Sequence, residues 1–115
     1  MTRSAQYLTD ADGLLRTGEQ GLWPRATAFL IRLALESCLD DYWRRVQPGV
    51  ERCDTRTQIL CLTHYRGQET SRLAARAWAG LSRACHYHGY ELSPTASELR
   101  ALHNEVGALL SRLSS

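Results

Sequence analysis

The chain has 115 residues, a length that suits one domain spanning 1–115 and is too short for two independent cores. Its 43% hydrophobic and 23% charged residues are ordinary for a globular protein and argue against disorder. The 14 basic and 12 acidic residues leave a net charge of +2, so the chain lacks the overall basicity of a dedicated nucleic-acid binder. Every basic residue is arginine.

Apolar residues at helical spacing predict five helices, and no segment shows the alternation of a strand. From Pro24 to Val46 the apolar side chains cover more than half of the helix circumference, so we expect this second helix to be central. Short connections between the helices predict an all-α antiparallel bundle. The expected helices span about 4–17, 24–46, 56–65 and 69–87, followed by a last helix that begins at Ser93 or Thr95 and continues to about Leu113.

The stretch from Trp78 to Tyr90, WAGLSRACHYHGY, concentrates chemically active side chains at the end of the fourth helix. An unbroken helix would place His86 beside Arg83, and His88 about 140° away on the core side. For Arg83 and His88 to act on one substrate, the helix must loosen before Gly89, or the face bearing His88 must be a groove or subunit interface. Which histidine faces a site is therefore open.

Three arginines form a row along the fourth helix. At about 100° per residue, Arg72, Arg76 and Arg83 lie within about 40° of one another and face away from its apolar side. Such a row can follow a phosphate backbone, because each guanidinium is a planar fork suited to phosphate. A solvated polar face gives the same pattern.

Arg83-x4-His88-x-Tyr90, at the end of a long helix in a small all-helical chain, resembles the Arg-x4–6-His motif of the HEPN superfamily. It is most similar to the Arg-x4-His-x-Tyr form of small bacterial HEPN toxins. The similarity of architecture extends over most of the chain and implies a HEPN-like bundle. One position departs from the family pattern: Ala84 follows the arginine, where a polar residue, often asparagine, is usual.

The resemblance implies a metal-independent endoribonuclease of the toxin or defence type. Its site would be built across a homodimer, with RNA as the substrate, no cofactor, and a cognate antitoxin or nucleotidyltransferase as a possible partner. In related toxins the matching tyrosine can be a target for such a nucleotidyltransferase. The expected site residues are Arg83 and His88 as catalytic groups, Tyr90 and His86 as supporting groups, and Arg72 and Arg76 as RNA contacts.

A second interpretation needs no catalysis. Arg83 can pair with Glu91 or Glu98 from the next segment, and His88 can cap the fourth helix, where the helix dipole favours it. The protein would then be a non-catalytic HEPN-like helical module that binds a protein or nucleotide partner. Ala84 favours this alternative.

Other sequence features point to no metal and no membrane. Cys85, His86 and His88 offer metal-binding atoms, but no fourth ligand follows at a zinc spacing, and His103 on the last helix is interpreted as a surface residue. There is no CxxC pair, no signal peptide and no apolar run long enough to span a membrane. We therefore expect reduced thiols in a cytoplasmic protein.

Overall fold

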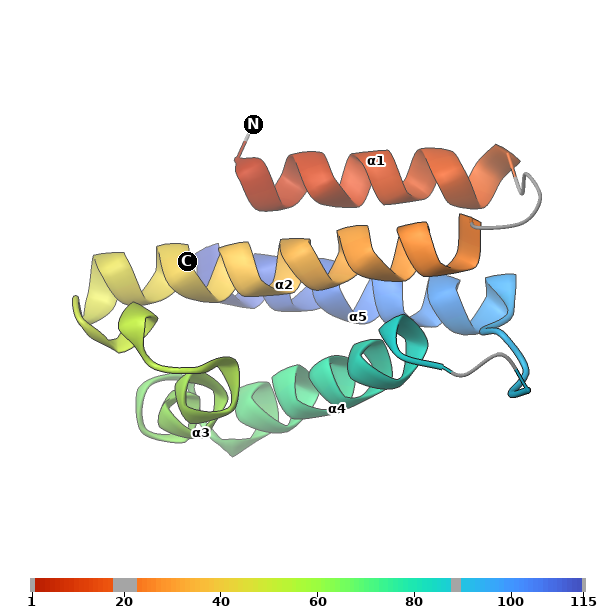
Figure 1. Cartoon of the computed structure of the whole chain (residues 1–115). Coiled ribbons are helices and arrows are strands. Elements are labelled where there is room, and N and C mark those ends of the chain that lie inside the picture. The colour runs from red at the N-terminus through yellow and green to blue at the C-terminus, as the bar shows by residue number, and fades with distance from the viewer. Residues whose placement is uncertain (1, 18–22, 88–89, 115) are drawn as a thin grey trace.

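The computed structural model describes residues 2–17, 23–87 and 90–114. In this part of the chain five α-helices and one short 3-10 helix form a bundle, with no strand (Figure 1). The all-α prediction is confirmed. The elements are α1 (Arg3–Thr17), α2 (Trp23–Val46), η1 (Val50–Arg52), α3 (Thr55–Arg66), α4 (Gln68–Cys85) and α5 (Ala96–Ser114).

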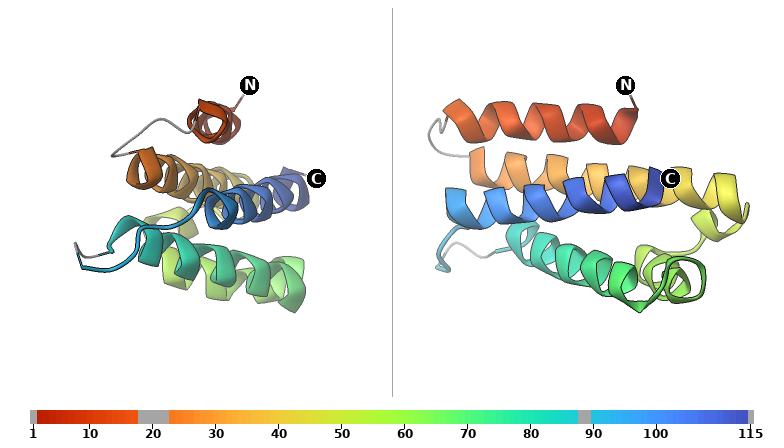
Figure 2. Two further views of the ribbon diagram at one scale, coloured as in Figure 1. Left: turned by 90° about the vertical axis from the view of Figure 1, so that its right-hand side faces the viewer. Right: turned by 180° about the vertical axis from the view of Figure 1, so that it is seen from behind.

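The four long helices alternate in direction along the chain and stack in three layers (Figures 1 and 2). α1 forms one outer layer, α2 and α5 lie side by side in the middle, and α4 lies in the third layer with the short α3. α3 is seen nearly end-on in Figure 1, where the others lie lengthwise, so it crosses them. The start of α2, the end of α4 and the start of α5 meet at one end of the molecule.

α2 is the centre of the bundle, as its apolar circumference predicts. It packs against α1, α3, α4 and α5. Ile31, Leu35, Leu39 and Trp43 of α2 are 0% exposed and belong to one cluster that includes side chains from all five α-helices. Burying a side chain of this size contributes about 1.5–3 kcal/mol, so α2 alone supplies a large share of the hydrophobic stabilisation.

The helix boundaries follow from specific capping contacts. Of the two predicted starts of α5, the structure uses Thr95: its Oγ1 accepts from the Glu98 N–H, and the Thr95 N–H donates to Glu98 Oε1, each at 3.0 Å. This is a capping box, and the Thr95 N–H holds the pKa of Glu98 below its ordinary value. Gly67, with φ 90°, ends α3 and precedes α4. α4 ends at Cys85, earlier than the expected end near Tyr87.

Polar contacts join α1 to α5. Asp12 accepts from Arg16 on its own helix and from Arg100 on α5, each at 2.8 Å. The hydrogen bond from Arg100 is the main reason why the pKa of Asp12 lies below its ordinary value. His103 Nε2 donates to the carbonyl oxygen of Leu8 at 2.9 Å, because a carbonyl can only accept. The interpretation of His103 as a surface residue was wrong, since it is half-buried against α1.

None of the helices in the described ranges has both the length and the apolar character that crossing a bilayer requires.

We expect Asp12→Asn to lower the melting temperature at neutral pH, because it removes the charge that Arg16 and Arg100 bind. The folded-state pKa of Asp12 is lowered, so its contribution is present above the ordinary value of 3.8 and is lost as the pH falls through the folded-state pKa. Thermal unfolding at pH 7 should separate the variant from the parent, and the gap should close in acid. Asp10→Asn, whose partner is Gln6 on the same helix, is the control.

Candidate functional site

The last turn of α4 is fixed by a small apolar cluster. Ala84 is 6% exposed and packs with Ala28 of α2 and Leu99 of α5, both 0% exposed. The position after Arg83 therefore faces the interior. A polar side chain there would have to be buried against these residues and find a hydrogen-bond partner, which explains physically why alanine suits this position.

Arg83 lies on the opposite side of this turn and is exposed. Within the described ranges its guanidinium makes no hydrogen bond or ion pair, although Glu91 and Glu98 line the same groove. Arg83 therefore pairs with neither Glu91 nor Glu98 in the structure, unlike in the second interpretation of the sequence. A charged fork held in an open groove is available to bind an anion.

The groove lies between the end of α4 and the start of α5 and has a volume of about 670 Å³. Gly80 of α4 and Leu102 of α5 both line the groove, and a Cβ added at Gly80 would lie 2.8 Å from Leu102 Cδ2. Glycine at this position thus leaves room for the end of the Leu102 side chain. The groove is lined by Arg83, Tyr87, Leu92, Pro94, Glu98 and Leu102, among others.

His86 is turned toward α2 and away from this groove. Its Nε2 lies 3.2 Å from Arg32 Nη1, and because a guanidinium has no acceptor, Nε2 must accept. Arg32 also reaches Glu36 at 3.4 Å. The lone pair that His86 would need as a base is thus occupied by Arg32, and Arg83 and His86 lie on different sides of the end of α4.

A contact that sequence analysis missed holds the segment after α4. Arg25 of α2 donates from Nη2 to the Tyr87 carbonyl oxygen at 2.9 Å, and its Cζ lies 4.5 Å from the centroid of the Tyr87 ring. The two residues are 62 positions apart, so no local pattern could have indicated the pair. Arg25 and Arg32 together bind the two residues that precede His88.

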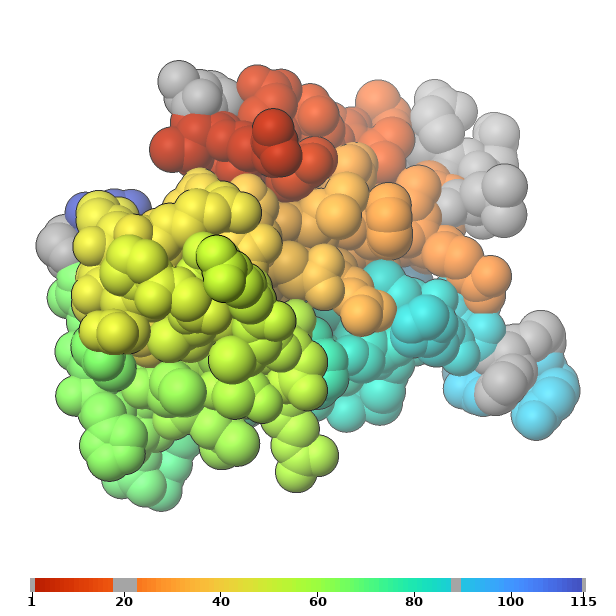
Figure 3. Space-filling model, turned by 60° about the vertical axis from the view of Figure 1, so that its left-hand side comes forward, coloured from red at the N-terminus to blue at the C-terminus, as the bar shows by residue number. Residues whose placement is uncertain are grey.

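Of the remaining motif residues, the structure describes only Tyr90. His88 and Gly89 lie outside the described residues, so the predicted catalytic role of His88 stays a prediction. Tyr90 is 91% exposed in a turn, and Leu92 is 96% exposed. The light-blue segment that follows α4 projects from the body of the molecule in Figure 3.

The arginine row predicted on α4 is exposed along its length. Arg72 and Arg76 line a hollow of about 390 Å³, and neither has a hydrogen-bond or ion-pair partner in the described part of the chain. Arg112 of α5 borders the same hollow, and its Nη2 lies 3.6 Å from Glu69 Oε1. The row is thus a solvent-facing line of positive charge that internal ion pairs leave unneutralised.

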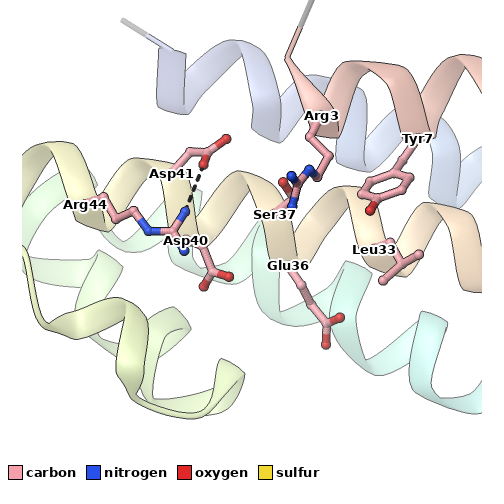
Figure 4. Close-up of a pocket in the computed structure, with 8 residues that line it drawn as sticks. All are labelled: Arg3, Tyr7, Leu33, Glu36, Ser37, Asp40, Asp41 and Arg44. Atoms are coloured by element: carbon pink, nitrogen blue, oxygen red, sulfur yellow. Dashed lines mark hydrogen bonds and ion pairs between the residues drawn. The ribbon is translucent and has the colours of Figure 1, made fainter.

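A hollow of opposite character lies between α1 and α2 (Figure 4). Three carboxylates line it, Glu36, Asp40 and Asp41, with Arg3 reaching in from α1. The one dashed contact drawn there joins Arg44 and Asp41 at 3.3 Å. No predicted site residue lies in this hollow.

Two of the four cysteines, Cys38 and Cys85, are poorly suited to act as nucleophiles. Burial raises the pKa of Cys38 to about 12, and burial also raises the pKa of Cys85 against the opposing effect of Arg32. A thiol with a raised pKa carries little thiolate at neutral pH. Among the described residues, no three of histidine, cysteine, aspartate and glutamate come together as metal ligands.

Comparison with family models, with characterised proteins and with solved structures finds no match to this chain. The residues and their geometry therefore carry the functional argument.

We expect Arg25→Ala to loosen the end of α4, because it removes both the ring contact and the hydrogen bond to Tyr87. Amide hydrogen exchange in the last turn of α4 should accelerate by about threefold to tenfold, while exchange in α3 stays unchanged. Arg44→Ala removes a charge elsewhere on α2 and serves as the control. Equal exchange in Arg25→Ala and parent would contradict the proposed restraint.

Proposed function

We propose that the protein is a metal-independent endoribonuclease of the HEPN toxin or defence type, active as a homodimer. One observation carries the proposal: the exposed Arg83 guanidinium has no partner in the described chain and lines an open groove at the end of α4. Arg83 stands five residues before His88 in the Arg-x4-His-x-Tyr pattern. Arg72 and Arg76 extend the positive charge along the same helix.

The chemistry requires three functions at one phosphate. A base removes the proton from the ribose 2′-hydroxyl, whose oxygen attacks the adjacent phosphorus, and an acid protonates the departing 5′-oxygen. Positive charge stabilises the intervening phosphorane. The products are a 2′,3′-cyclic phosphate and a 5′-hydroxyl, and the reaction needs no metal ion or redox partner.

One chain supplies one Arg83 and one His88, so a two-fold dimer supplies the pair of histidines needed for the two proton transfers. An imidazole with a pKa near the unperturbed 6.5 can act as either acid or base at neutral pH. His86 is bound to Arg32, so its supporting role in the site would be to hold the end of α4 in place. The exposure of Tyr90 agrees with a role in contacting substrate or a modifying nucleotidyltransferase.

A second candidate function is favoured by a different observation. Leu92, which lines the groove, is 96% exposed, Tyr90 is 91% exposed, and large exposed apolar side chains are found at contact surfaces. Together with the buried Ala84, they favour a non-catalytic module that binds a protein or nucleotide partner. In that case RNA would remain intact, while partner binding would depend on Leu92.

Incubation of the purified protein with RNA in EDTA tests the catalytic proposal. We expect cleavage, and we expect Arg83→Ala and His88→Ala each to reduce its rate by at least about 100-fold, the usual scale for loss of a group that stabilises transition-state charge or of a catalytic acid or base. Arg52→Ala removes an exposed arginine from η1, far from the motif in sequence, and should cleave at the parental rate. Circular dichroism would verify that each variant is folded.

Two results would refute the nuclease proposal: uncut RNA with the parent protein, or full activity in both motif variants. The solution mass is an independent check, because a strictly monomeric protein cannot build the composite site.

The arginine row makes a separate prediction about affinity. If Arg72 and Arg76 contact RNA phosphates, each alanine substitution should weaken the binding of single-stranded RNA and reduce the slope of log K against log salt by about 0.7. Fluorescence anisotropy with a non-cleavable oligonucleotide at several salt concentrations measures both effects. Arg52→Ala should leave the slope unchanged, and an unchanged slope in the row variants would show that the row is only a solvated face.

A further inference from the structure

The groove beside Arg83 offers more than a phosphate contact. Its volume of about 670 Å³ falls within the range of small-molecule sites, about 300–1,000 Å³. Leu92, Pro94 and Leu102 give it apolar walls, and one guanidinium and two carboxylates line the same space, where Arg83 and Glu98 do not pair with each other. An occupant that satisfies all of these groups must be partly flat and apolar, partly anionic, and equipped with hydrogen-bond donors.

Tyr87 supplies an aromatic surface in this groove. Arg25 holds the residue through its carbonyl oxygen and covers the ring at 4.5 Å, so the side chain is fixed before any ligand arrives. Stacking on an aromatic ring stabilises every base, because each base has a π-face. Tyr87 thus favours a nucleobase without selecting among the four.

Glu98 supplies the selective group. Its Oε1 accepts the Thr95 N–H of the capping box, while Oε2 has no partner among the described residues. A carboxylate has about four lone-pair positions, so the side chain can still accept two further donors. The cap also lowers the pKa of Glu98, so the carboxyl group is ionised at neutral pH and can only accept hydrogen bonds.

Guanine matches this acceptor best among the four bases. Its Watson–Crick edge presents N1–H and the N2 amino group side by side, so one carboxylate can accept from both. Adenine and cytosine each offer one amino group beside an acceptor nitrogen that would repel the carboxylate, and uracil offers one N–H between two carbonyl oxygens. RNA-binding proteins commonly read single-stranded bases on this edge.

We propose that the groove between the end of α4 and the start of α5 binds a guanine nucleotide, with Tyr87 against the base, Glu98 on its Watson–Crick edge and Arg83 on its phosphate. This inference rests on the proposed function in placing an RNA phosphate at Arg83, and it deepens that function by naming the preferred base. The RNA would be cut next to guanosine.

Nucleotide binding without cleavage tests the inference. Equilibrium dialysis of the full chain with GMP, AMP, CMP and UMP should show GMP binding at least about tenfold more tightly than the others, which is the discrimination expected of one bidentate pair. Glu98→Gln retains the capping box, because glutamine also serves at that position, but it replaces one acceptor oxygen by a donor. The variant should lose the GMP preference at an unchanged melting temperature.

Two further variants complete the test. Glu105→Gln makes the same change two turns farther along α5, outside the groove, and should keep the preference. Ala101→Trp fills the groove at an exposed lining position and should abolish binding of all four nucleotides.

Equal binding of the four nucleotides, no binding by the parent protein, or an unchanged preference in Glu98→Gln would each overturn the inference. The outcome is separable from that of the nuclease proposal. Selective GMP binding by a protein that leaves RNA intact would support the guanine site and refute the nuclease proposal. Cleavage without base preference would support the nuclease proposal and refute the guanine site.

Discussion

The structure depends on the burial of α2 on every side. A helix with apolar residues around most of its circumference is unstable in water until other helices cover it. Ile31, Leu35, Leu39 and Trp43 are fully buried because α1, α3, α4 and α5 all pack on this one helix. This requirement brings the start of α2 against the end of α4, where Ala28 packs on Ala84, and the candidate groove lies between α4 and α5 beside that turn.

The arrangement of charge explains how a nearly neutral chain can present a basic surface. The net charge is only +2, but the acidic side chains Glu36, Asp40 and Asp41 gather in the hollow between α1 and α2. Arg72, Arg76 and Arg83 of α4, which make no ion pair within the described part of the chain, line other surfaces. In the hollow beside Arg72 and Arg76, three arginines face one carboxylate, Glu69, so the local charge is positive although the summed charge of the chain is small.

The end of α4 shows where helical extrapolation fails. A helix continued to Tyr87 would put His86 beside Arg83, yet α4 ends at Cys85 and His86 turns to Arg32. The deciding contacts are long-range: Arg32 with His86 and Arg25 with Tyr87, separated by 54 and 62 positions. Local periodicity carries no information about such partners. The groove beside Arg83 is likewise created by the meeting of two helices.

The sequence by itself determined the helices, their approximate ends, the central place of α2 and the exposed arginine row, because periodicity and capping act within a few residues. It offered two starts for α5, and the reciprocal bonds of Thr95 and Glu98 selected one. Only the tertiary structure decided that Ala84 is buried, that His103 binds α1 and that Arg83 has no partner among the described residues. Each of these depends on which distant helix lies opposite, and packing of the whole chain determines that.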